Sequence, residues 1–278
     1  MRPGNIIATP IDALPENAIA VVEFKSLESF SAENFSTPQW QDLNKLQLFR
    51  RLEESVVLLS ELASGNPEIY AAVQGGKIAA AAIGVKSGEV EYIFAMQAKG
   101  LRLNKLELLL NSEKAQVSKY SSSKTDIYEF AFAGSTVICT KVGNLFLCSK
   151  SKILIEASVA QLKNADGLGN NEAFRNVYTL NTKNDVPDFY LNLDQFALYA
   201  GYFLQTSFSN KIDVLRRFTA WIGFEWKITE NAILMNGYAS GNRPSQPGSL
   251  SEYTGNEVAF DLASNFLLRN TAYYIQSA

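Results

Sequence analysis

Apolar residues recur with a helical period over the longest regular stretch of the chain. Between residues 38 and 63 they return at intervals of three and four, at Trp40, Leu43, Leu46, Phe49, Leu52, Val56, Leu59 and Leu62. Thr37 ahead of Pro38 is a favourable N-cap, and the Gly-Asn-Pro sequence at residues 65–67 is typical of a helix end. We therefore expect one helix over residues 38–63 that lays a single apolar stripe on a sheet.

Shorter apolar runs between turn-forming residues predict strands. The first covers residues 18–24 and is followed by a loop that carries Phe30 and Phe35. Residues 69–97 are predicted to form three strands, with hairpin turns at Gly75-Gly76 and Ser87-Gly88. The four alanines at residues 79–82 are assigned to a strand, because a helix there would leave these glycines without a purpose.

Further strands are expected in the second half of the chain, at residues 116–121, 126–133, 138–148, 189–193 and 221–239. The segment 138–148 is a hairpin that turns at Gly143-Asn144. The segment 221–239 is a hairpin that turns at Glu230-Asn231 and places Trp226 opposite Met235.

Five more segments have helical spacing, at residues 101–111, 151–162, 171–180, 194–205 and 212–218. Ser151 and Asp194 are the expected caps of two of them. Together with the strands, these helices predict an α+β fold of mostly antiparallel sheets. The expected building block is a repeated strand-strand-strand-helix unit, with helices covering one face of the sheets.

The same pattern divides the chain into four parts. Residues 1–112 are expected to form a first antiparallel sheet with the long helix, and residues 113–239 a second sheet-helix module packed on the first. Residues 240–256 are rich in Ser, Gly and Pro and predict a loop or linker. Residues 257–278 form a terminal segment that is a candidate for the start of a further module.

Composition excludes several classes of function. The chain of 278 residues has no histidine, which removes Ser-His and Cys-His nucleophile pairs and His-ligated zinc. A net charge of −3 provides no basic field for nucleic acid. The first residues, MRPGNIIATPIDALP, lack the basic-then-apolar order of a signal peptide, so we expect a soluble chain.

The two cysteines, Cys139 and Cys148, flank the predicted Gly143-Asn144 turn at equal distances. Counting outward from the turn makes them direct cross-strand partners in a non-hydrogen-bonded position, where Cα atoms lie about 4.5 Å apart. That spacing is at the short end of what a disulfide tolerates. Two reduced, packed thiols and a strained disulfide are both compatible with the pattern, whereas a metal or catalytic site would lack further ligands.

Three polar motifs have ordinary structural explanations. A calcium site could be assembled on paper from Asn184, Asp185, Asp188, Asn192 and Asp194, but a turn and a helix cap explain the same residues. The loop at residues 166–171, Asp-Gly-Leu-Gly-Asn-Asn, lacks the Lys-Ser/Thr of a nucleotide-binding loop. Glu53 and Glu54 are adjacent on a helix and cannot face each other as a catalytic pair. We expect no catalytic residue, metal or cofactor.

Aromatic residues gather near the last hairpin and could line a groove for a partner or ligand. The candidates are Tyr199, Tyr202, Phe203, Trp221, Phe224 and Trp226. Packing in the core explains them equally well.

The order of elements resembles a family of bacterial proteins, the domain-of-unknown-function family thirty-three fifty-two. The similar segments are the opening strand after residues 14–18 (Leu-Pro-Glu-Asn-Ala), the long helix, residues 134–151 with the helix after them, and the strand at 187–192. The resemblance implies an envelope protein with an N-terminal membrane anchor and no assigned activity. In longer members a second half opens with a segment similar to residues 266–276. This chain carries no such anchor, and Leu268 stands where a proline is expected.

We therefore expect a non-enzymatic binding or scaffold protein of the bacterial cell envelope, on the periplasmic or cell-surface side. Its expected partner is an envelope protein, with no nucleic acid and with membrane contact only through an anchor that this chain lacks. The alternative is a carrier that holds an apolar ligand in a cavity between sheet and helices. An enclosed apolar cavity would favour the carrier, and a filled core with an exposed apolar patch would favour the binding module.

Overall fold

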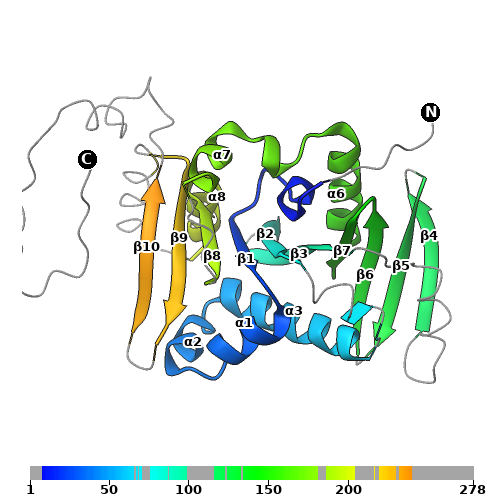
Figure 1. The fold of residues 1–278 in the computed structure, drawn as a ribbon, viewed down its shortest axis with the longest axis horizontal. Helices are drawn as coiled ribbons and strands as arrows, with labels where there is room; N and C mark the ends of the chain where they lie inside the picture. Colours follow the sequence, from blue (N-terminus) through cyan, green and yellow to red (C-terminus); the bar gives the residue numbers. More distant parts are fainter. Residues whose placement is uncertain are drawn as a thin grey trace, which may run out of the picture.

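A computed structural model describes residues 8–65, 67, 69–70, 76–86, 88–98, 116–122, 124–132, 134–180, 186–203, 216, 219–229 and 232–239. Within them, ten strands form one sheet in the order β10-β9-β8-β1-β2-β3-β7-β6-β5-β4. Every neighbouring pair is antiparallel. Helices lie on both sides of this sheet (Figure 1).

The strands have the following bounds: β1 Ala20–Phe24, β2 Ile78–Lys86, β3 Glu89–Gln97, β4 Gln116–Ser122, β5 Thr125–Phe132, β6 Ser135–Val142, β7 Leu145–Ser149, β8 Asp188–Asn192, β9 Trp221–Ile228 and β10 Ile233–Ala239. The antiparallel α+β architecture predicted from the sequence is confirmed. The repeated strand-strand-strand-helix unit is wrong, because the strands of one sheet come from the chain in unequal runs.

The strands of residues 1–112 and of residues 113–239 belong to one sheet rather than to two. β1 pairs with β2 on one side and with β8 on the other, and β3 pairs with β7. The first three strands therefore form the centre, and later strands extend it in both directions. The boundary at residue 112 stays a prediction, since residues 99–115 lie outside the described residues.

Three helices follow β1 and cover one face of the sheet: α1 Leu27–Asn34, α2 Pro38–Leu43 and α3 Gln47–Ser64. Their apolar side chains meet alternate residues of the central strands in a first core cluster. Ala80 and Ala82 of β2 belong to this cluster. Phe196 and Tyr199 of α8 (Leu193–Ala200) pack against the same cluster.

The opposite face carries a second core cluster, so the expectation that helices cover one face only is wrong. Its helices are η1 Pro10–Ala13, α6 Lys152–Asn164, η2 Leu168–Asn170 and α7 Glu172–Tyr178. Ala79 and Ala81 of β2 point to this side. A strand such as β2 is apolar at every position because both of its faces are covered.

The single long helix predicted over residues 38–63 is two helices, with a break at residues 44–46. The rings of Trp40 and Phe49 lie 5.9 Å apart. In a continuous helix two residues nine apart point in opposite directions and stand about 13 Å apart along the axis. The Trp40 indole also donates a 2.6 Å hydrogen bond to Glu53. These tertiary contacts require the break that the apolar spacing did not reveal.

Other local predictions were wrong for similar reasons. Phe30, expected in a loop, is a buried residue of α1, where it stacks on Phe24 at 4.5 Å. Ile69 and Tyr70, expected at the start of a strand, are helical. The cap of α8 is Asn192, whose side chain accepts from two backbone N–H groups, and not Asp194.

Several local predictions are confirmed. Thr37 and Ser151 cap α2 and α6 through their hydroxyl groups. The short helix expected at 171–180 is α7. Cys139 pairs with Cys148 across the β6–β7 hairpin, and Trp226 pairs with Met235 across the last one.

The helix at 101–111, the loop at 240–256, the segment 257–278 and the turn at Glu230-Asn231 lie outside the described residues, as does the helix at 212–218 apart from Arg216.

The glycine-bearing loop at residues 166–171 packs against η1. A Cβ on Gly167 would lie 1.8 Å from the backbone oxygen of Asp12, and one on Gly169 would lie 2.0 Å from that residue's carboxylate. The Leu168 amide donates a 2.8 Å hydrogen bond to the Leu14 carbonyl. These glycines allow two backbones to meet, which explains the motif without a phosphate.

We expect Gly167→Ala to lower the free energy of unfolding by about 1–3 kcal/mol, because the added methyl group collides with backbone that cannot move aside. Urea denaturation followed by circular dichroism measures this loss. Gly84→Ala is the matched control, since a Cβ there meets only Ile19 at an ordinary 3.7 Å. An equal effect of both substitutions would contradict the role given to Gly167.

Candidate functional site

The six aromatic residues expected to share a groove are not brought together. Trp226 is buried in the first core cluster and Trp221 in the second, on the opposite face of the sheet. Phe224 stacks on Phe189 at 5.2 Å, and Tyr199 packs against the first cluster. Core packing therefore accounts for these four residues. The two others, Tyr202 and Phe203, are exposed.

The two exposed rings belong to an apolar patch that we call the α8 surface, formed by Val85, Leu198, Tyr202 and Phe203. Their exposed fractions are 41%, 63%, 60% and 58%. The helix explains this exposure. Leu193 and Ala200, seven residues apart, share the buried side of α8, whereas Leu198 is five residues from Leu193 and points about 140° away.

A hollow of about 320 Å³ lies beside this surface, between α8 and the end of the β2–β3 hairpin. Val85, Leu198 and Tyr202 line it together with the amide side chains of Asn17 and Gln195. The hairpin is shaped by Gly88, which has a φ of +75° and whose missing Cβ leaves room for the Phe203 ring. The α8 surface thus combines apolar rings with a polar recess.

A second feature is a row of carboxylates across three adjacent strands. Glu23 of β1 is the register partner of Asp188 of β8, and Asp188 is the partner of Glu225 of β9. Glu23 and Asp188 are each only 3% exposed. Direct cross-strand partners have Cβ atoms about 5 Å apart, so the acids on these strands are held close together.

Two polar side chains, Tyr178 and Lys77, contact the Glu23 carboxylate. The Tyr178 hydroxyl donates to one carboxylate oxygen at 3.2 Å, and Lys77 lies 3.5 Å from the other. Burial raises the pKa of Glu23, the charge of Asp188 raises it further, and Lys77 and Tyr178 oppose the shift. Burial, with the nearby charges of Asp188 and Glu225, also raises the pKa of Tyr238 to about 12.

This row can hold a proton, but it does not form the site expected of an acid-base enzyme. A catalytic carboxylate must come within hydrogen-bonding distance of its substrate, and Glu23 and Asp188 are buried beneath the helices of the second face. Among the described residues, no group of three or more Asp, Glu or Cys side chains has a geometry suited to a metal ion.

The described members of the calcium set considered from the sequence serve separate purposes. Asp188 belongs to the carboxylate row, Asn192 caps α8, and Asp194 lies 2.9 Å from Arg216. Asn184 and Asp185 lie outside the described residues.

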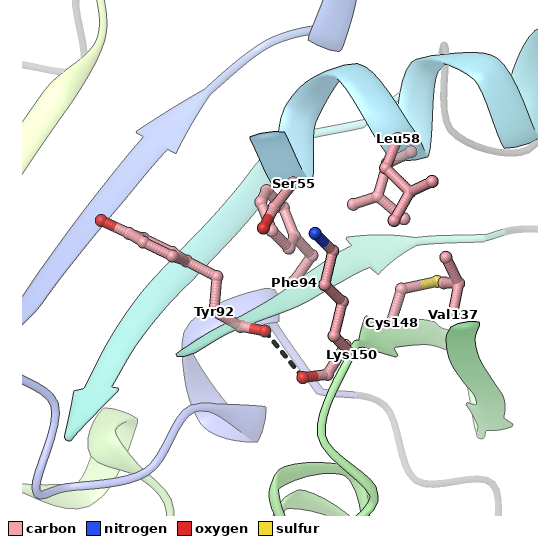
Figure 2. A pocket seen from close by; sticks show the side chains of 9 residues that line it. Ser55, Leu58, Tyr92, Phe94, Val137, Cys148 and Lys150 are labelled. Atoms are coloured by element: carbon pink, nitrogen blue, oxygen red, sulfur yellow. Dashed lines mark hydrogen bonds between the residues drawn. The ribbon is translucent and has the colours of Figure 1, made fainter. Parts of the chain in front are cut away.

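A third feature is the cysteine pair, of which Cys148 lines a small hollow under α3 (Figure 2). Both cysteines are free thiols with no exposed surface, and their sulfur atoms are 2.8 Å apart. Cys148 lines the hollow, which holds about 10 Å³. Burial raises the pKa of the Cys148 thiol, and the neighbouring Cys139 raises it further.

Sequence reasoning missed Glu23 and Glu225. The signal for Glu23 was its place within the apolar run Ala-Val-Val-Glu-Phe, where a charged residue needs a partner. Its neighbours Asp188 on β8 and Glu225 on β9 are determined by the order of strands in the sheet, which cannot be derived from local sequence patterns.

No protein-family model, no curated protein and no solved structure matches this chain. The resemblance to the envelope family therefore stays a prediction.

We expect Glu23→Gln to flatten the pH dependence of stability. The ordinary pKa of Glu23 is 4.5 and the folded value is higher, so the folded state binds more protons than the unfolded state between these values. Stability therefore falls as the pH rises from about 4.5 through the folded pKa. Glutamine cannot titrate and removes this contribution.

Urea titrations at a series of pH values measure the effect. Glu16→Gln is the control, because Glu16 is exposed. Identical pH slopes for the wild type and Glu23→Gln would show that the buried carboxyl does not govern this dependence.

Proposed function

We propose that this protein is a non-enzymatic binding module of the bacterial cell envelope, which holds a protein partner on the α8 surface. The observation that carries the proposal is the grouping of four exposed apolar side chains on α8, the turn after it and the β2–β3 hairpin. Exposure of contiguous apolar groups to water is unfavourable, and such patches are typical of surfaces that bind a partner.

The chemistry of the surface indicates what it would bind. Tyr202 and Phe203 supply aromatic area, which dominates binding energy at protein interfaces. The recess beside them carries Asn17, Gln195 and Lys86. A suitable partner therefore presents an apolar anchor flanked by groups that hydrogen-bond to amides.

The packing of the core favours this function over the carrier. The hollows within the first core cluster, beneath α3 and around Trp40, hold about 10 Å³ each. Such a space accommodates about one water molecule and no apolar ligand. Enzymatic acid-base chemistry has less support, because Glu23 and Asp188 of the carboxylate row lie buried.

The envelope location rests on the resemblance in the order of elements. Among the described residues, no helix combines the length and the apolar character needed to span a membrane.

Photo-crosslinking in the source cells tests the proposal. A photoreactive residue at Leu198 should give a reproducible protein adduct. The same residue at Ile153 should give none, although Ile153 is a 76% exposed apolar residue of α6. The double variant Tyr202→Ser/Phe203→Ser should weaken capture at least tenfold, since aromatic anchors contribute about 2 kcal/mol or more each.

The melting temperature of the double variant should stay close to that of the wild type, because both rings are exposed. Equal adducts from positions 198 and 153, or unchanged capture by the double variant, would refute the proposal. Fractionation of the same cells tests the envelope location separately.

A further inference from the structure

Cys139 and Cys148 are the only cysteines of the chain, and the fold places them side by side. Neither is exposed, and their sulfur atoms are 2.8 Å apart. A disulfide bond is about 2.05 Å long, so the sulfurs need to approach by less than 1 Å to form one. The α8 surface plays no part in this arrangement.

The hairpin register makes that approach compatible with the backbone. Val142 and Leu145 flank the two-residue turn as a pair, and counting outward puts the cysteines in a non-hydrogen-bonded position. Cα atoms at such positions lie about 4.5 Å apart, within the range that disulfides span. The strands need not separate or slide for the bond to form.

The hollow under α3 borders one of the two cysteines. Cys148 lines it, together with Ser55 and Leu58 of α3 and with Val137 and Lys150 of the sheet side. Figure 2 shows the Lys150 side chain reaching toward Ser55 above the cysteine. Cys139 does not line this hollow, so Cys148 is the cysteine that a small solute in the hollow would meet first.

The size of the hollow selects the oxidant. About 10 Å³ admits a molecule of the size of water. Hydrogen peroxide is only slightly larger than water and carries no charge. Glutathione disulfide consists of two tripeptides and cannot enter without displacing α3.

We propose that Cys139 and Cys148 form a peroxide-reactive pair, in which Cys148 is oxidised first and Cys139 then closes a reversible cross-strand disulfide. The Cys148 thiolate attacks one peroxide oxygen, the O–O bond breaks, and a sulfenic acid and hydroxide result. The Cys139 thiolate attacks the sulfenic sulfur and displaces a second hydroxide. With the two protons released by the thiols, two thiols and one peroxide give one disulfide and two water molecules.

The reaction is slow in the folded protein, because the thiolate is the reactive form and burial keeps its population low. Its rate should therefore rise as the pH increases. Once formed, the disulfide joins neighbouring strands under α3, and dithiothreitol returns both thiols by exchange.

Treatment of the folded protein with millimolar hydrogen peroxide tests the pair. After quenching and denaturation, the wild type should lose both maleimide-reactive thiols and the mass of two hydrogen atoms, and dithiothreitol should restore both. Glutathione disulfide at the same concentration should leave both thiols reactive. Two thiols that survive peroxide, or equal rates with both oxidants, would overturn the proposal.

Single variants test the order of events. Cys139→Ser keeps the thiol that borders the hollow and should form a sulfenic acid that dimedone traps, whereas Cys148→Ser should react at least tenfold more slowly. Equal trapping in both variants would show that Cys148 is not the entry point. If a serine variant fails to fold by circular dichroism, the alanine variants, which bury no hydroxyl, provide the same comparison.

Discussion

Strand β1 has hydrogen-bonded neighbours on both sides, β2 and β8, and this double pairing joins the two halves of the sheet. All five of its residues are buried. Val22 and Phe24 contribute to the core under α1 and α3, and Val21 to the core under α6 and α7. This one short strand therefore contributes to both core clusters and connects the two halves of the sheet.

The same strand carries the least expected side chain of the core, Glu23. A buried carboxylate is costly unless it is paired and hydrogen-bonded. Tyr178 and Lys77 supply those contacts, and Asp188 in register adds a second acid at close range. The hydrogen bond from Tyr178 connects β1 to α7, and Lys77, which directly precedes β2, provides the opposite charge. Because Glu23 and Asp188 are both buried, we interpret this pair of acids as a structural feature of the core.

Two features of the described residues are proposed to contact the surroundings. The α8 surface exposes aromatic and aliphatic side chains beside a polar recess, which suits a macromolecular partner. The cysteine hollow admits only the smallest solutes. The two lie on different elements, so a change in the redox state of the cysteines need not disturb binding at α8.

Part of this architecture follows from local sequence. Thr37 and Ser151 cap helices because their hydroxyls accept backbone N–H groups within one turn. The Gly143-Asn144 turn fixes the cysteine register, since pairing next to a tight turn can be counted residue by residue. The α+β class and the antiparallel sheet followed from the same short-range rules.

Other features depended on contacts between residues far apart in the chain. The break after α2 arises because Trp40 packs against Phe49 and Trp226, and helical spacing does not record such contacts. The aromatic residues of the last hairpin were divided between two cores because successive side chains of a strand point to opposite faces.

The sequence by itself determined the Thr37 and Ser151 helix caps, the β6–β7 hairpin and the pairing of the two cysteines, because each depends on residues within about ten positions of one another. Only the tertiary structure decided that β8 lies beside β1, that Glu23 faces Asp188, and that α8 leaves Leu198 and its neighbours in water. The pairing of β8 with β1 and of Glu23 with Asp188 depends on the order of strands in the sheet. That order must allow both faces of the sheet to be buried at the same time.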